Sequence, residues 1–401
     1  MTMTERFLKY VAVGTNSNPA SKTIPSSPEQ KILGAIIVED MKAMGIKDAF
    51  MDDYGYVYGT VEGNCSAPTV GFIAHMDTVI DMPCENIKPR MVEYKGGEVV
   101  LNEEKGISFT PEKEHLGHTL IVTDGTTLLG GDDKAGIVEI LEMAKYYLEH
   151  PEVKHGTIKI GFTPDEEIGR GADKFDVKGF GADVGFTVDG GSPACISYEN
   201  FNACAAHVRI NGTNTHPGGA KNAMVNSMWI AMEFHSMLPC NEAPQFTEGY
   251  EGFSHLNGIH GNVERTDMEY IIRDHDKALF QSQKARFEKI VAYLNEKYGE
   301  GTVELTLTDS YYNMKEPVME HPEIIEIANA AITDAGYTPY ASAARGGTDG
   351  ARLSYMGLPC PNLGTGGANA HSRYEYVSLQ EMDGVCQILK NIVDRYSKIE
   401  K

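Results

Sequence analysis

The sequence has no excess of basic residues and no long apolar run. Its 401 residues include 35 lysines and arginines against 57 aspartates and glutamates, which gives a formal net charge of −22. Nucleic acids and anionic membrane surfaces both attract basic faces, so the acid excess argues against either as a main partner. No stretch approaches the roughly 18–20 apolar residues of a membrane-spanning helix. We therefore expect neither a nucleic-acid partner nor a membrane partner.

The sequence also lacks the spacing of a cysteine framework. Its 7 cysteines are odd in number and widely spaced, and no C-x-x-C motif occurs. A disulfide scaffold or a cysteine-ligated zinc site is therefore not expected. Buried or idle thiols are typical of a reducing compartment, which predicts a cytoplasmic protein. Residues 1–13 place charged side chains within an apolar pattern, which predicts an amphipathic helix and not a signal peptide.

Apolar runs that alternate with helical patterns predict an α/β fold. Residues 70–74, 158–162 and 184–188 have the length and composition of buried strands, and residues 134–148 have the spacing of a helix. Strands that alternate with helices of this length are typical of a mixed, mostly parallel sheet flanked by helices. A chain of this length is also expected to form more than one domain.

The pattern changes between residues 203 and 310. There the order is strand, helix and strand, followed by a long helix at residues 277–298 and another strand. This order is typical of a smaller α+β sandwich inserted into the first domain. We therefore expect residues 1–202 and 311–401 to form the α/β domain and residues 203–310 to form an inserted lid or dimerisation domain.

Acidic and histidine residues follow the predicted strands. In an open α/β sheet, ligands bind beyond the carboxyl ends of the strands. Each residue by itself is more typical of a loop, a turn or a helix cap. Their recurrence at equivalent positions predicts that they converge at one edge of the sheet. The residues concerned are His75, Asp77, Asp132, Asp133, Glu166, Glu167, Asp189 and His371.

Two histidines and three carboxylates at one edge would suit Zn²⁺ better than Mg²⁺ or Ca²⁺, which prefer oxygen ligands alone. Carboxylates packed so closely would repel one another unless cations lay between them. Two zinc ions would remove that conflict and would lower the pKa of a shared water toward about 7. Because the adjacent side chains of Glu166 and Glu167 point in different directions, one can bind metal while the other accepts a proton.

Taken together, these motifs resemble the five motif blocks of the M20 zinc peptidases. The matching segments are His75-Met76-Asp77, Gly131-Asp132-Asp133-Lys134, Asp165-Glu166-Glu167, Val188-Asp189-Gly190-Gly191 and the late His371. Other segments are similar to those of the tripeptide aminopeptidases in that family, among them Thr215-His216-Pro217-Gly218, Ile271-Ile272-Arg273-Asp274 and Arg345-Gly346-Gly347-Thr348-Asp349-Gly350. The resemblance extends over nearly the whole chain.

The resemblance implies two Zn²⁺ per subunit and a set of ligands for them. His75 and Asp189 would hold one ion, Glu167 and His371 would hold the other, and Asp132 would bridge the two. In the family the peptide bond after the bridging aspartate is cis, so we expect a cis bond between Asp132 and Asp133.

The resemblance also implies roles for residues that do not bind metal. Glu166 would be the general base, and Asp77 would hydrogen-bond His75 and fix its tautomer. His216, in the inserted domain, would stabilise the oxyanion, either in its own subunit or across a homodimer interface formed by that domain. Arg273 and Arg345 are candidates to bind the terminal carboxylate of the substrate, because a guanidinium binds a carboxylate through two parallel hydrogen bonds, and structural ion pairs are the alternative for both.

The expected activity is hydrolysis of the N-terminal residue from tripeptides by a metal-bridged hydroxide. A dipeptidase or an N-acyl-amino-acid deacylase on the same scaffold would share every metal ligand and differ only in what closes the substrate pocket. A metal-holding dimerisation protein without activity is a third interpretation. That interpretation is weakened by Glu166, because a protein without activity would have no need of a base that does not bind metal.

Overall fold

The structure is a computed structural model that describes residues 1–400, and these fold into two compact units. Unit 1 is formed by Met1–Tyr198, by Met314–Ser342 and by the chain from Thr348 onward. Unit 2 is formed by Glu199–Asn313 and by the short segment Ala343–Gly347. The role of residues 203–310 as a lid or dimerisation domain stays a prediction.

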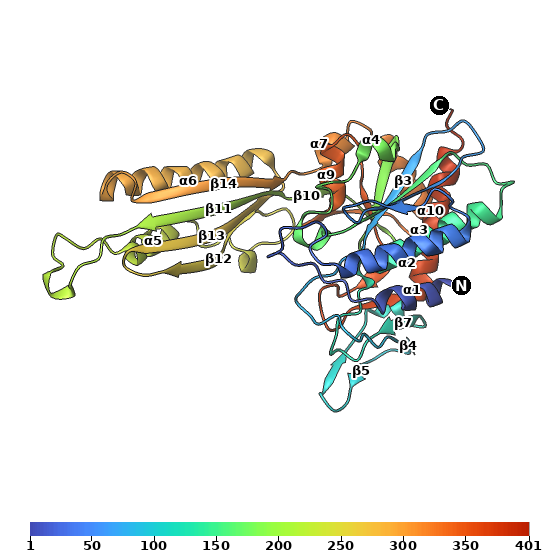
Figure 1. Ribbon diagram of the computed structural model, residues 1–401, viewed down its shortest axis with the longest axis horizontal. Coiled ribbons are helices and arrows are strands. Elements are labelled where there is room, and N and C mark those ends of the chain that lie inside the picture. Colours follow the sequence, from blue (N-terminus) through green and yellow to red (C-terminus); the bar gives the residue numbers. More distant parts are fainter. Residues whose placement is uncertain (401) are drawn as a thin grey trace. The chain divides into compact units, whose positions relative to one another are not determined.

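A mixed sheet that includes β3 lies among the helices of unit 1 (Figure 1). It has eight strands in the order β1-β2-β8-β3-β9-β16-β10-β15. The strands are β1 Phe50–Met51, β2 Val57–Val61, β3 Val70–His75, β8 Ile158–Thr163, β9 Val184–Val188, β10 Cys195–Asn200, β15 Tyr340–Ala344 and β16 Asn362–Leu363. Strands β8, β3, β9 and β16 run parallel to one another, while β2 and β10 pair antiparallel at either side. The predicted α/β class, with a mostly parallel sheet at its centre, is confirmed.

Strand β3 is buried on both faces, which explains its continuous apolar sequence. Phe72 and Ala74 pack into the larger core cluster together with Ile137 of helix α3, whereas Ile73 packs into a second cluster with Leu353. The helices of unit 1 are α1 Met3–Val11, α2 Glu29–Met44, α3 Gly131–Glu149, α4 Val177–Phe180, α7 Lys315–Val318, α8 Glu323–Asp334, α9 Asp349–Tyr355 and α10 Leu379–Tyr396.

Two smaller sheets complete unit 1. One has the order β17-β18-β7-β4 and the other pairs β5 with β6. Their strands are β4 Arg90–Glu93, β5 Val99–Asn102, β6 Ile107–Phe109, β7 Thr119–Val122, β17 Gly367–Ala368 and β18 Tyr376–Ser378. Because β18 leads directly into α10, the four-stranded sheet connects the middle of the chain to its last helix.

Unit 2 is a four-stranded antiparallel sheet with two helices. The strand order is β12-β13-β11-β14. Its elements are β11 Asn202–Asn211, α5 Ser227–Ser236, β12 Phe253–Gly261, β13 Arg265–Asp274, α6 Lys277–Tyr298 and β14 Val303–Tyr311. Alternate residues of β13 are buried, and Tyr270 packs there against Phe234 of α5 and Phe287 of α6. This alternation is what a sheet covered by helices on one face requires.

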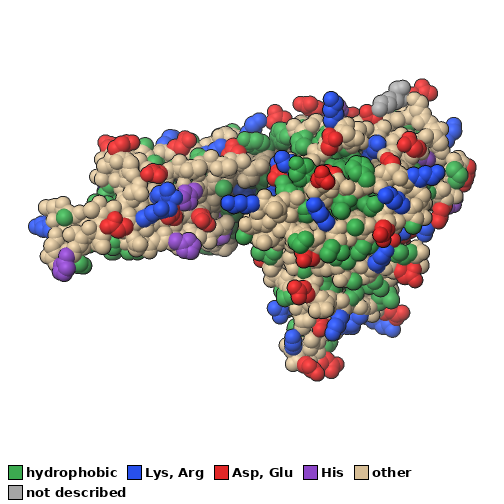
Figure 2. Space-filling model, in the orientation of Figure 1, with side chains coloured by type: hydrophobic (Ala, Val, Ile, Leu, Met, Phe, Trp, Pro, Cys, Tyr) green, Lys and Arg blue, Asp and Glu red, His purple; other side chains and the backbone are tan. Residues whose placement is uncertain are grey.

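The surface agrees with the absence of a basic excess in the sequence. On the visible face of unit 1, acidic and basic side chains are interspersed and do not gather into one basic area (Figure 2). Among residues 1–400, no helix combines the length and the apolar character needed to cross a membrane.

We predict that Ile137→Ala lowers the free energy of unfolding by about 2–5 kcal/mol, because it leaves a cavity in the core of unit 1. Ile137 is 0% exposed in α3. The matched control is Ile32→Ala in α2, where the side chain is 55% exposed and the expected change is within about 0.5 kcal/mol. Urea unfolding followed by circular dichroism measures both, and equal losses in the two variants would contradict this packing.

Candidate metal centre at the sheet edge

The candidate site lies where four parallel strands end. His75 is the last residue of β3, Glu166 and Glu167 follow β8, and Asp189 follows β9. His371 lies in the loop between β17 and β18, which follows β16. Because parallel neighbours end at the same edge of a sheet, these segments converge although they are far apart in sequence.

Asp132 lies between two imidazoles. Its Oδ1 is 2.9 Å from His75 Nε2, and its Oδ2 is 3.2 Å from His371 Nε2. The two oxygens of one carboxylate therefore face two different histidines, which is the position required of a bridging ligand. The peptide bond between Asp132 and Asp133 is cis, as the resemblance predicts.

The remaining predicted ligands complete two groups around this carboxylate. His371 Nε2 is 3.1 Å from Glu167 Oε2, and His75 Nε2 is 3.7 Å from Asp189 Oδ1. The structure thus brings together all five side chains that the sequence predicts as metal ligands. A residue not among them, Asp133, also lies within reach of His75 and Asp189.

These distances fit a pair of cations. Two ligand atoms bound to one tetrahedral zinc ion at 2.0–2.1 Å lie roughly 3.3–3.4 Å apart. The four nitrogen–oxygen distances between the predicted ligands range from 2.9 to 3.7 Å. In addition, Glu167 Oε1 is a buried side-chain oxygen without a hydrogen-bond partner, which a cation at this position would satisfy. The mixture of nitrogen and oxygen donors suits zinc-like ions.

The electrostatics of the site show how strongly these groups depend on one another. Burial would raise the pKa of Asp132, but hydrogen bonds from His371 and His75 hold it well below its ordinary value. Hydrogen bonds to Asp132 and Glu167 raise the pKa of His371 to about 11. Burial raises the pKa of Asp189 to about 8. The carboxylates therefore favour positive charge on the groups that lie between them.

Asp77 holds the two ligand-bearing loops together. Its carboxylate is buried, with Oδ1 3.4 Å from His75 Nδ1. The same carboxylate accepts hydrogen bonds from the backbone N–H groups of Glu166, at 2.9 Å, and Glu167, at 3.1 Å. The sequence predicts only the contact with His75. The two hydrogen bonds from the backbone explain why Glu166 and Glu167 are fixed beside Asp77.

Glu375 supports the backbone around Asp132 in a similar way, and no sequence motif indicates this role. Its Oε1 accepts a hydrogen bond from the backbone N–H of Asp132, and its Oε2 accepts from those of Leu129 and Gly130, each at 2.9 Å. Burial raises the pKa of Glu375 to about 7. An acid between a loop and a short strand has no distinctive sequence pattern, so only the fold reveals this role.

Asp349 is a further buried acid beside the site. Thr163, at the end of β8, donates a hydrogen bond to its Oδ2 at 2.7 Å. Burial raises its pKa to about 6. Asp349 belongs to the segment Arg345–Gly350 that supports the family resemblance, and Thr348 caps its helix, so a signal for it existed in the sequence.

Two residues of the site have a backbone conformation that is uncommon outside glycine. Asp165 has φ 60° and His371 has φ 62°, both in the left-handed region. The carboxylate of Asp165 accepts hydrogen bonds from the backbone N–H of Ser26 and from Gln30 Nε2, which holds the turn before Glu166 in place. Such outliers concentrate at functional sites, where the surrounding structure maintains them.

Three predicted site residues, His216, Arg273 and Arg345, belong to unit 2. His216 is exposed, and its Nδ1 accepts a hydrogen bond from the backbone N–H of Gly218 at 3.1 Å. Arg273 Nη1 donates to the backbone carbonyl of Ile272 at 3.0 Å, and its guanidinium lies 5.5 Å from the ring centre of Tyr311.

The guanidinium of Arg345 is already engaged within unit 2. It donates to the backbone carbonyls of Thr247, Gly249 and Glu251 and to the hydroxyl of Thr247, at 2.7–3.3 Å. It also lies 5.0 Å from the ring centre of Phe201. Arg345 therefore joins the segment Ala343–Gly347 to the 247–251 loop.

The comparison with known proteins agrees with the geometry. The model of peptidase family M20/M25/M40 matches residues 111–395. A peptidase T from Alkaliphilus oremlandii is 52% identical over 99% of both chains, and one from Clostridium perfringens is 52% identical over 98% of both chains.

Solved structures show the same fold. A tripeptidase from Staphylococcus aureus matches 99% of this chain and 98% of its own, with a TM-score of 0.80 at 22% identity. Aminopeptidase PepT from Bacillus cereus matches over the same shares with a TM-score of 0.79 at 21% identity. At such identities the likeness concerns the fold, whereas the family model and the full-length relatives are matched in sequence. This chain therefore belongs to the M20/M25/M40 family of peptidases.

Proposed function

We propose that the chain is a metal-dependent aminopeptidase that removes the N-terminal residue from tripeptides. The observation that carries the proposal is the position of Asp132 between two imidazoles, in a chain that is 52% identical to a peptidase T over nearly its whole length. The substrate class follows from the names of the relatives, which include a tripeptidase among the solved structures.

Two divalent cations would be held by the five side chains described above. His75 and Asp189 would bind one, Glu167 and His371 the other, and Asp132 both. A solved neighbour from Bacillus subtilis is described as a dinuclear metal binding peptidase of the M20 family, which supports the same number here. The donor set favours zinc. Such a cation pair supplies a Lewis acid for the peptide carbonyl and makes water a stronger acid.

Glu166 would act as the proton carrier. Its backbone N–H and that of Glu167 both donate to Asp77, which fixes the turn that carries the two carboxylates, and the charges of His75 and Asp189 act on the carboxyl of Glu166. Burial raises the pKa of Glu166 well above its ordinary value, which favours retention of an accepted proton. Glu166 would take a proton from the water that attacks the carbonyl carbon and would give it to the amine as the C–N bond breaks.

His216 would stabilise the oxyanion. Because its Nδ1 accepts a hydrogen bond from Gly218, the proton of the neutral ring lies on Nε2. That N–H can donate to an oxygen that gains negative charge in the transition state. His216 would serve the active site of its own subunit or that of a partner subunit.

Arg273 is the better of the two proposed carboxylate-binding residues. The terminal amino groups of Arg345 are occupied by four hydrogen bonds to the 247–251 loop. The contacts of Arg273 with the backbone are made through Nη1. We therefore propose that Arg273 binds the terminal carboxylate of the peptide and that Arg345 shapes the loop beside it.

A dipeptidase or deacylase activity would use the same metal ligands but is less well supported, because the full-length relatives are peptidases T. A cytoplasmic location remains part of the proposal. It is supported by the seven cysteines, all of which are free thiols.

We predict that Glu166→Gln lowers kcat by about 10²–10⁴-fold, because the water loses its proton acceptor while the shape of the side chain is kept. The tripeptide assay should be combined with metal analysis of the same sample, and the metal content should equal that of the wild type. The control Glu62→Gln, at an exposed position, should leave kcat unchanged.

The wild type stripped of metal by a chelator provides the complementary comparison. Its activity should disappear and return when zinc is added, whereas Glu166→Gln should stay inactive with its full metal content. Near-normal turnover by Glu166→Gln would exclude it as the base. Full activity in exhaustively chelated wild type would exclude a metal-dependent reaction.

We also predict that acetylation of the α-amine of a tripeptide lowers kcat/KM by at least about tenfold, because the substrate then loses a charged group that the acidic site attracts. Rates should be compared for matched free and acetylated di-, tri- and tetrapeptides, and the free tripeptide should be cleaved fastest. Equal turnover of the acetylated and free tripeptides would instead support the deacylase alternative.

A homodimer through unit 2 is a separate part of the proposal. Trp229 and Met232 of helix α5 are 69% and 51% exposed. Exposed aromatic side chains of this kind dominate binding energy at protein interfaces. We predict that Trp229→Asp raises the dimer dissociation constant by at least about tenfold. Sedimentation equilibrium measures this, with Tyr293→Asp on α6 as the control; a monomeric wild type would exclude the dimer.

A further inference from the structure

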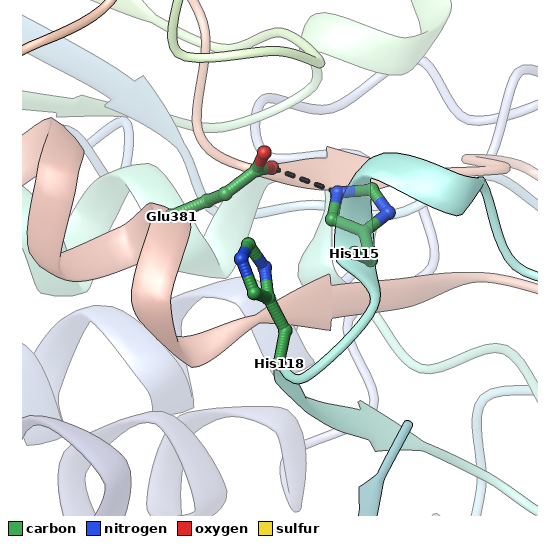
Figure 3. A group of neighbouring side chains, drawn as sticks. All are labelled: His115, His118 and Glu381. Atoms are coloured by element: carbon green, nitrogen blue, oxygen red, sulfur yellow. Dashed lines mark ion pairs between the residues drawn. The ribbon is translucent and has the colours of Figure 1, made fainter. Parts of the chain in front are cut away.

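A second group of metal-binding side chains lies outside the catalytic site, in the region of the smaller sheets. His115, His118 and Glu381 each offer one ligand atom, and these atoms lie within 4.8 Å of one another. His115 Nε2 is 3.1 Å from Glu381 Oε2. Figure 3 shows the carboxylate of Glu381, on α10, directed toward His115, with the ring of His118 beside both. None of the three is among the ligands assigned above.

A tight turn brings the two histidines together. The backbone N–H of His118 donates to the carbonyl of His115 at 2.9 Å. Between them, Gly117 has φ 88°, which favours glycine because side chains are strained there. The two ring centres are 5.5 Å apart. The local sequence His115-Leu116-Gly117-His118 therefore builds a rigid pair of imidazoles.

Each imidazole is oriented by a hydroxyl group on strand β18 or at its end. Tyr376 Oη is 3.0 Å from His115 Nδ1, and Ser378 Oγ is 2.8 Å from His118 Nδ1. These contacts leave Nε2 of each ring for a ligand. Metal-binding histidines typically have their other nitrogen fixed in this way, which sets the ring orientation and the tautomer.

Charge and burial also suit a cation. His115 is buried, whereas His118 and Glu381 are partly exposed, so an ion has access from solvent. The hydrogen bond to Glu381 raises the pKa of His115, which indicates that the group attracts positive charge. A metal ion that replaced this proton would keep the carboxylate neutralised and would release the proton.

We propose that His115, His118 and Glu381 form an additional binding site for one zinc-like divalent cation, separate from the catalytic pair. Two nitrogen donors and one carboxylate match zinc in ligand type, and three protein ligands leave a coordination position for water. The site joins the turn before β7 to the first turn of α10. Thr119 strengthens the same junction, because its backbone N–H donates to Gln380 Oε1 at 2.8 Å.

The test is the number of zinc ions bound per chain. Full-length protein is stripped with a chelator, reloaded with excess zinc, freed of unbound metal by gel filtration and measured by elemental analysis. His118→Ala should bind one zinc ion fewer than the wild type. Glu381→Gln should show the same loss, and it keeps the shape of the side chain if His118→Ala disturbs folding. Circular dichroism checks that each variant is folded.

The matched control is His321→Ala. His321 Nδ1 is 3.5 Å from Glu323 Oε1 on the surface, so it forms a histidine–glutamate pair without a second imidazole, and its loss should not change the zinc content. His371→Ala tests the catalytic pair separately, and its loss of zinc should add to that of His118→Ala. If folded His118→Ala and Glu381→Gln both bind as much zinc as the wild type, the proposal is wrong and the three residues form only an ion pair with a neighbouring imidazole. This conclusion does not depend on the result for His371→Ala.

Discussion

Mutual repulsion among partly buried carboxylates is the constraint on which the rest of this structure depends. Asp132, Asp189 and Glu167 lie at one sheet edge, and burial opposes the ionised form of each. Such a group of acids is tolerated only when positive charge lies between its members. The imidazoles of His75 and His371 lie between these acids, and the same geometry would allow two divalent cations to supply positive charge there in place of protons.

Two further acids show how the fold maintains this arrangement. Asp77 accepts hydrogen bonds from the backbone at Glu166 and Glu167, and Glu375 does so from the backbone around Asp132. Each fixes a loop that carries a predicted ligand without taking a ligand's position. Precise placement of reacting groups requires such support, because small displacements of a catalytic group are costly in rate.

The group formed by His115, His118 and Glu381 uses the same donor chemistry in a different structural setting. Its histidines are held by a turn and its glutamate by the first turn of a helix, whereas the catalytic ligands follow strands. The group of His115, His118 and Glu381 joins two segments of unit 1, whereas the catalytic ligands surround the proposed reaction centre. The surroundings, more than the donor types, therefore distinguish a cation that would stabilise the fold from cations that would take part in hydrolysis.

The sequence by itself indicated the α/β class, because the apolar runs at residues 70–74, 158–162 and 184–188 have the length of strands buried on both faces and alternate with helical patterns. Its motifs also predicted which five side chains would meet, although their roles as ligands stay predictions. The function of Glu375 and the contact between His115 and Glu381 were decided only by the tertiary structure. Both join segments distant in sequence through single side chains, and such contacts leave no periodic pattern from which they could be read.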